Sequence, residues 1–194
     1  NETFDRIMLG WWAPVSSEGA AKAEVGIYSA CYKLSLLISL SVQAFRMGAE
    51  PFFFKQSTSE NAPRTYARVM KFFVITLCLM FLFVMLYVDL WKYFITDHSM
   101  WVGLKVVPVL LLANMFLGIY YNLSIWYKLG NKTIAGAYIT LIGAGVTLLI
   151  NYLFIPAYSY VACAWATFAC YGIMMVVSYV WGQKNYRIPY AKNK

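Results

Sequence analysis

The sequence predicts an all-α fold: a polytopic transmembrane helix bundle with about five complete spans and the end of a sixth. Hydrophobic residues make up 61% of the 194 residues and charged residues only 12%, whereas soluble domains carry roughly 25% charged residues. The mean hydropathy is +0.59. Trp and Tyr gather where the apolar runs end, as expected for aromatic belts at the two membrane interfaces.

The longest apolar stretch, residues 25–50, also carries polar groups on one side. At ~1.5 Å per residue this helix would be roughly 39 Å long, enough to cross a hydrocarbon core of ~30 Å. We expect Pro51 to end or kink it. Within roughly 80° of a helical wheel it places a polar stripe of seven residues: Tyr28, Tyr32, Ser35, Ser39, Gln43, Arg46 and Glu50. Because a charge in lipid costs at least ~2.5 kcal/mol, the stripe must face protein or a water-filled cavity.

The other apolar runs predict the remaining helices. Residues 1–12 look like the end of a helix whose beginning is missing, and residues 13–24 form a loop. The further predicted spans are residues 72–88, which we expect to face lipid, then 108–127, 133–154 and 160–181. The span 133–154 has a face of small residues on which another helix can pack: Gly136, Thr140, Gly143, Thr147 and Asn151.

Loop charges predict the topology. Basic residues dominate the segments 55–71 and 128–132 and the tail, so the positive-inside rule puts these segments and the C-terminus in the cytoplasm. The net charge of +8 therefore sets topology and does not indicate a nucleic-acid partner. We expect a single transmembrane domain over residues 1–194, which begins with Asn and reads as a piece of a longer chain.

The sequence contains no catalytic motif: no GxSxG, no HExxH, no P-loop and no paired carboxylates in a span. The four cysteines lie inside apolar runs without CxxC spacing, which predicts packing residues and no metal site. His98, the only histidine, stands beside Asp97 in a predicted outer loop and reads as a solvated side chain. We therefore expect neither enzymatic activity nor a cofactor.

Charge inside the membrane is the remaining chemical feature. Arg46 and Glu50 are four residues apart on one face, where they can form an ion pair that holds helices together. Alternatively, Arg46 binds an anionic ligand, since guanidinium contacts phosphate oxygens in bidentate fashion. Lys33 either snorkels or reaches a second cavity. Asp5 and Arg6 either form a helix-end pair at the interface or face the same cavity as the stripe.

These residues carry a resemblance to a known family. The matching pieces are Asp5-Arg6-Ile7-Met8-Leu9-Gly10, Gly26-Ile27-Tyr28-Ser29-Ala30 with Tyr32-Lys33, Gln43-Ala44-Phe45-Arg46, and Glu50-Pro51-Phe52-Phe53-Phe54. Over residues 1–70 the chain resembles Wzx-type oligosaccharide flippases of the multidrug/oligosaccharidyl-lipid/polysaccharide exporter superfamily. The rest matches that superfamily only in span number and loop charge.

The resemblance implies the second lobe of a two-lobed transporter, with the N-terminal lobe of the same protein as its missing partner. It implies export of an undecaprenyl-pyrophosphate-linked oligosaccharide across the bacterial plasma membrane, for surface polysaccharide synthesis by alternating access. The implied headgroup cations are Arg6, Lys33 and Arg46, with Tyr28, Tyr32, Ser39 and Gln43 lining the cavity and Asp5 and Glu50 as gating or counter-charge residues. The alternative is a cation-coupled multidrug exporter of the same superfamily.

Overall fold

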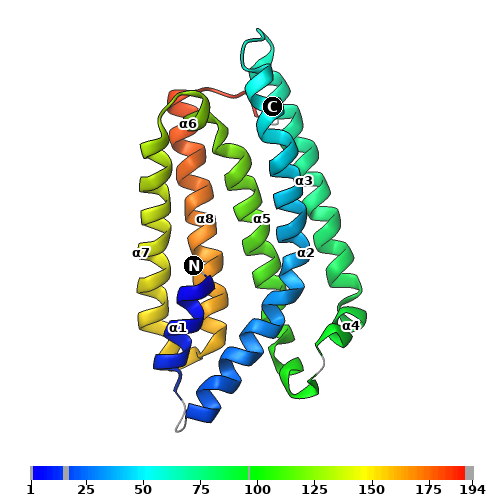
Figure 1. Ribbon diagram of the computed structural model, residues 1–194, viewed down its shortest axis with the longest axis vertical. Helices are drawn as coiled ribbons and strands as arrows, with labels where there is room; N and C mark the ends of the chain where they lie inside the picture. The colour runs from blue at the N-terminus through cyan, green and yellow to red at the C-terminus, as the bar shows by residue number, and fades with distance from the viewer. Residues whose placement is uncertain (1, 15–17, 96, 191–194) are drawn as a thin grey trace.

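The computed structural model describes residues 2–14, 18–95 and 97–190 of the chain. In these ranges all regular secondary structure is helical, and five helices are long and apolar enough to cross a membrane. Figure 1 shows the long helices side by side along the longest axis of the molecule. The prediction of an all-α, multi-span membrane bundle is confirmed.

The chain begins with α1 (Glu2–Trp12), α2 (Glu18–Gln56) and α3 (Ala62–Leu86). Short helices then lead to the next long one: α4 (Val88–Trp91), η1 (Lys92–Phe94) and η2 (His98–Val106). The second half contains α5 (Val107–Leu123), α6 (Ile125–Leu129), α7 (Thr133–Tyr158) and α8 (Tyr160–Asn185). The predicted third span is therefore divided at Ser124 into α5 and α6.

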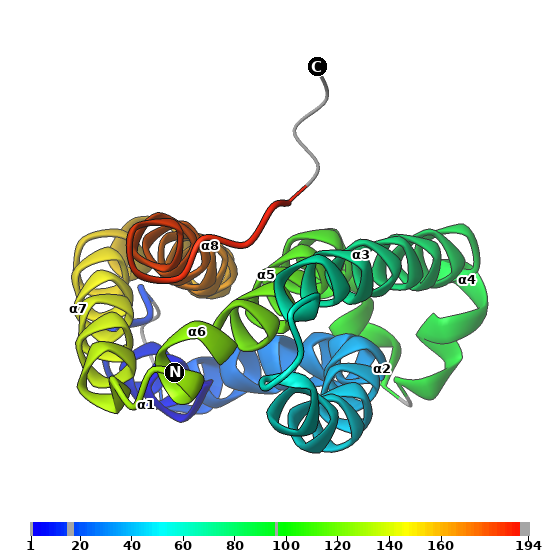
Figure 2. The same ribbon diagram turned by 90° about the horizontal axis from the view of Figure 1, so that it is seen from above.

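Helix α5 is the centre of the bundle. It packs against α2, α3 and α8, while α8 also packs against α7. Viewed from above, α1 and α2 lie on one side of the molecule and α3 and α8 on the other, with α7 at one edge (Figure 2). The core between α2, α5 and α8 is filled by apolar side chains such as Ile38, Leu110 and Cys163, each with no exposed surface.

Helix α2 differs from its predicted bounds at both ends. It starts at Glu18, inside the predicted loop, and continues past Pro51 to Gln56. Proline leaves the carbonyl of residue 47 without its helical donor, and Met47 lies on the exposed side of the helix. The turn after Pro51 is fixed by packing, since Phe53 is buried and its carbonyl accepts a 2.8 Å hydrogen bond from Tyr66 Oη on α3. Tertiary contacts therefore outweigh the local tendency of proline to end a helix.

The predicted loop 55–71 is also mostly helical. Helix α3 begins at Ala62, with Pro63 in its first turn, where the missing N–H costs nothing. After its first turns, α3 exposes large apolar side chains along its length, namely Phe72, Leu79, Leu82, Phe83 and Leu86. This exposure agrees with the predicted lipid-facing span.

The small-residue face of α7 packs against α8, as predicted. A Cβ atom at Gly143 would lie 2.5 Å from Met174 Sδ and 3.0 Å from Cys170 Sγ, so only glycine permits this close approach. Gly136, Thr147 and Asn151 are buried on the same face, and Thr140 is exposed.

The two ends of the bundle differ in charge. One end, here called the basic end, contains the α2–α3 turn, the α6–α7 turn and the end of α8 (top of Figure 1). It carries Lys55, Arg64, Lys128, Lys132, Lys184 and Arg187. The opposite end, called the far end, contains η1, η2 and the α7–α8 turn, where acidic Glu24, Asp89 and Asp97 are interspersed with basic Lys22, Lys92 and Lys105. The three segments predicted to share one side of the membrane do lie at one end.

Candidate functional site

The predicted site residues divide into two groups along α2. Tyr28 and Tyr32 lie toward the far end, and Arg46 and Glu50 lie toward the basic end. Tyr28 and Arg46 are eighteen residues apart, which is about 27 Å along a helix at 1.5 Å per residue. Residues that share one face of a long helix therefore do not share one depth in the membrane.

The first group surrounds Asp5, which has no exposed surface. Its Oδ1 accepts a 2.6 Å hydrogen bond from Asn151 Nδ2 on α7, and its Oδ2 accepts one of 2.8 Å from Thr167 Oγ1 on α8. Tyr28 Oη on α2 also donates to Oδ2, over 3.2 Å. These four residues, here called the Asp5 cluster, join α1, α2, α7 and α8 around one carboxylate.

All three side-chain donors of the Asp5 cluster are neutral. A buried carboxylate is stable only when its lone pairs receive hydrogen bonds, and these donors supply them. Tyr28 and Tyr32 were predicted to line a cavity. In this chain they are core residues instead, with exposed fractions of 0% and 5%. Asp5 is likewise inside the packed core and not at a helix-end interface.

Ser39, the next predicted lining residue, links α2 to α5. Its hydroxyl donates a 2.6 Å hydrogen bond to Asn114 Oδ1, and Asn114 Nδ2 donates to the Leu110 carbonyl over 2.9 Å. Gln43, one turn further along α2, is exposed. The side chains of the polar stripe thus become more exposed toward the basic end.

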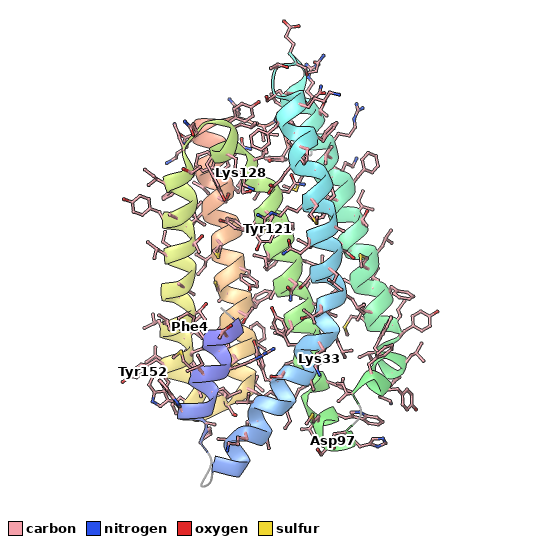
Figure 3. All side chains as sticks on the ribbon, in the orientation of Figure 1. Phe4, Lys33, Asp97, Tyr121, Lys128 and Tyr152 are labelled. Carbon is pink, nitrogen blue, oxygen red and sulfur yellow. The ribbon has the colours of Figure 1, made fainter. Side chains whose placement is uncertain are left out.

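The second group is an ion triad of Arg46, Glu50 and Lys128. Arg46 Nε donates a 2.8 Å hydrogen bond to Glu50 Oε1, and Lys128 Nζ donates to the same oxygen. The guanidinium also lies over the Tyr121 ring, with Cζ 4.7 Å from the ring centroid, a cation–π distance. Figure 3 shows Tyr121 and Lys128 on the α5–α6 segment, beside α2.

The ion triad is only partly buried. The side chains of Arg46, Glu50 and Lys128 are 37%, 34% and 23% exposed. Ion pairs with this exposure are screened and contribute roughly 0–1 kcal/mol each, so they can open at little cost. The triad has two cations and one anion, and its net charge of +1 is accessible from outside the chain.

A small pocket adjoins the ion triad between α2, α3, α5 and α6. Its volume of about 10 Å³ is enough for about one water molecule. Arg46, Glu50 and Lys128 line it together with Tyr121 and Asn122. The predicted ion pair thus borders a small space between four helical segments.

Sequence reasoning missed Lys128, because we placed it in a turn outside the span. The available signal was its spacing: Lys128 follows Tyr121 by seven residues, two helical turns, and so falls on the same face if the helix continues. The interruption at Ser124 is short, and α6 keeps this direction closely enough for Lys128 to reach Glu50.

The other two predicted cations do not join Arg46. Arg6 is half-buried and lines a hollow between α1 and the start of α2, together with Lys22, Trp11 and Val25. Lys33 is exposed and lies well below Tyr121 and Lys128 in Figure 3. Within the described part of the chain, neither Arg6 nor Lys33 lines the pocket that adjoins Arg46.

Comparison of the chain with protein-family models, with curated proteins and with solved structures gave no match.

The Asp5 cluster yields a stability prediction. Asn151→Leu removes the donor to Asp5 Oδ1 and leaves this buried oxygen without its partner, at a cost of about 1–3 kcal/mol. We expect a lower midpoint in thermal unfolding of the purified protein in detergent.

Thr140→Val on the same helix is the matched control. Thr140 is exposed and its hydroxyl donates to the Gly136 carbonyl of its own helix, so we expect a change below about 0.5 kcal/mol. Equal destabilisation by the two substitutions would contradict a central role for the Asp5 carboxylate.

Proposed function

We propose that this chain belongs to a membrane transporter that moves an undecaprenyl-pyrophosphate-linked oligosaccharide from the inner to the outer leaflet of a bacterial plasma membrane. The product would serve surface polysaccharide synthesis, such as O-antigen or capsule. The observation that carries the proposal is the ion triad, in which Arg46 and Lys128 present accessible positive charge on membrane-length helices.

The chemistry of such a substrate fits the ion triad. A diphosphate needs cationic donors, and a guanidinium binds its oxygens in bidentate fashion while a lysine adds a compact charge. The Tyr121 ring beside Arg46 offers an aromatic face next to the headgroup position. The lipid tail remains in the bilayer, where α3 exposes its apolar side chains.

The charge of the basic end supports a cytoplasmic placement of this end and of the C-terminus. The ion triad then lies near the leaflet in which the lipid-linked glycan is assembled. Rocking of this lobe against a second lobe would open the site alternately to each side, as the family resemblance implies.

Arg46→Ala tests this function. In a bacterium whose surface glycan export depends on the protein, we expect the substitution to abolish export and to make lipid-linked glycan accumulate in the inner leaflet. Membrane insertion, measured by the amount of protein in washed membranes, should be unchanged.

Arg68→Ala is the control, because Arg68 is an exposed arginine of α3 toward the same end of the bundle. It should leave export at the wild-type level. Normal export by Arg46→Ala would exclude Arg46 from the substrate site.

A second candidate function, a cation-coupled exporter of small toxic compounds, is favoured by the Asp5 cluster. Such exporters use a carboxylate embedded in the membrane, and Asp5 is fully buried among four helices. In addition, Asn151 Oδ1 is buried and has no hydrogen-bond partner within the described part of the chain. Carboxylate and amide oxygens are the ligands that hard cations prefer.

Asp5→Asn tests this second function. If the protein is a cation-coupled exporter, cells that contain it expel a fluorescent cationic dye in response to a proton or sodium gradient, and Asp5→Asn abolishes this efflux. Asp97→Asn at the far end is the control, since Asp97 precedes the third span, accepts hydrogen bonds from Ser99 and should not matter for efflux. Efflux that survives collapse of both gradients would rule out ion coupling.

A further inference from the structure

The two cations of the ion triad converge on a single atom. Arg46 Nε and Lys128 Nζ both donate to Oε1 of Glu50, so one carboxylate oxygen occupies the point where their positive charges meet. The donors come from different parts of the fold, α2 and α6, and Tyr121 of α5 covers one face of the guanidinium. This arrangement is that of an anion site with a protein carboxylate already in it.

A third donor at the same pocket has nothing to bind. Asn122 is 5% exposed, and its Nδ2 has no hydrogen-bond partner within the residues that the structure describes. Buried amide donors are nearly always paired, so an unpaired one beside an anion site calls for a partner. Asn122 lines the same pocket as Arg46, Glu50 and Lys128.

We propose that Glu50 is a placeholder anion, whose carboxylate fills a phosphate site formed by Arg46, Lys128 and Asn122 Nδ2 until the phosphate of a substrate displaces it. This inference rests on the proposed flippase function of the same site and specifies how its headgroup is received. No covalent step is involved, since one anion replaces another.

The geometry allows the exchange. The pocket of about 10 Å³ is too small for a phosphate while Glu50 remains in place, so the carboxylate has to leave. Glu50 is 34% exposed and has a flexible side chain, so it reaches water by rotamer changes alone. Its departure breaks the direct link from α2 to α6 through Lys128, and the bound phosphate replaces that link because it contacts Arg46 of α2 and Lys128 of α6.

The experiment is a calorimetric titration of inorganic pyrophosphate into the purified protein in lipid nanodiscs. Glu50→Gln removes the competing charge at nearly constant shape, and we expect pyrophosphate to bind about tenfold tighter than to the wild type. Glu60→Gln is the matched control: it changes the net charge equally, but Glu60 lies in the exposed α2–α3 turn. It should change the affinity less than about twofold.

Two further variants test the cations and the amide. In the Glu50→Gln background, Lys128→Met should weaken pyrophosphate binding about tenfold, while Lys132→Met, a lysine at the same end that contacts Asn185, should leave it unchanged. Asn122→Leu should also weaken pyrophosphate binding. Because Asn122 Nδ2 has no hydrogen-bond partner in the described fold, the substitution breaks no existing hydrogen bond of this donor. Circular dichroism and gel filtration confirm that each variant is folded.

The outcomes separate the placeholder from the function itself. Equal pyrophosphate affinity of Glu50→Gln and Glu60→Gln, or no binding by Glu50→Gln, overturns the placeholder even if Arg46→Ala abolishes glycan export. Conversely, normal export by Arg46→Ala refutes the flippase function whatever the titration gives. A parallel titration with farnesyl pyrophosphate identifies the source of the anion, since only a lipid-borne headgroup gains affinity from its chain. With either ligand, the ratio of the affinity of Glu50→Gln to that of the wild type tests whether Glu50 is a placeholder.

Discussion

The cost of placing polar groups in hydrocarbon is the constraint on which this bundle depends. Helix α2 is long enough to cross a membrane, yet it carries a polar stripe along most of its length. Each group of the stripe must receive a partner from another helix or reach water. That requirement fixes the rotation of α2 and makes α5, which packs against the same side, the centre of the molecule.

The two halves of α2 meet this constraint in different ways. Toward the far end, the Asp5 carboxylate of α1 is buried among neutral donors from three other helices, including Tyr28, which suits a rigid core or a buried ion-coupling group. Toward the basic end, Arg46 and Glu50 form a partly exposed network with Lys128, which can open and exchange partners. A closed half and an adaptable half on one helix suit a transporter that binds at one depth and moves as a body.

The sequence alone predicted the fold class, the five spans and the grouping of basic segments, because hydropathy and loop charge act over many residues. Helix ends were less predictable: α2 continues through Pro51 because Phe53 is held by Tyr66, a contact between distant residues. The Arg46–Glu50 pair follows from a local spacing of four, whereas the Lys128 contact needs the path of α5 and α6. A helical wheel shows direction and not depth, so it grouped Tyr28 with Arg46 and did not reveal two separate clusters.

The central claim is that the polar side of α2 is sealed near Ser35 and open to water near Arg46. Accessibility of single cysteines to a water-soluble maleimide tests it most directly, in a background in which Cys31, Cys78, Cys163 and Cys170 are replaced by alanine. We predict that Arg46→Cys reacts in intact membranes. Because Ser35 has no exposed surface, Ser35→Cys should react only after denaturation. Equal labelling of both positions, or protection of Arg46→Cys, would contradict the claim.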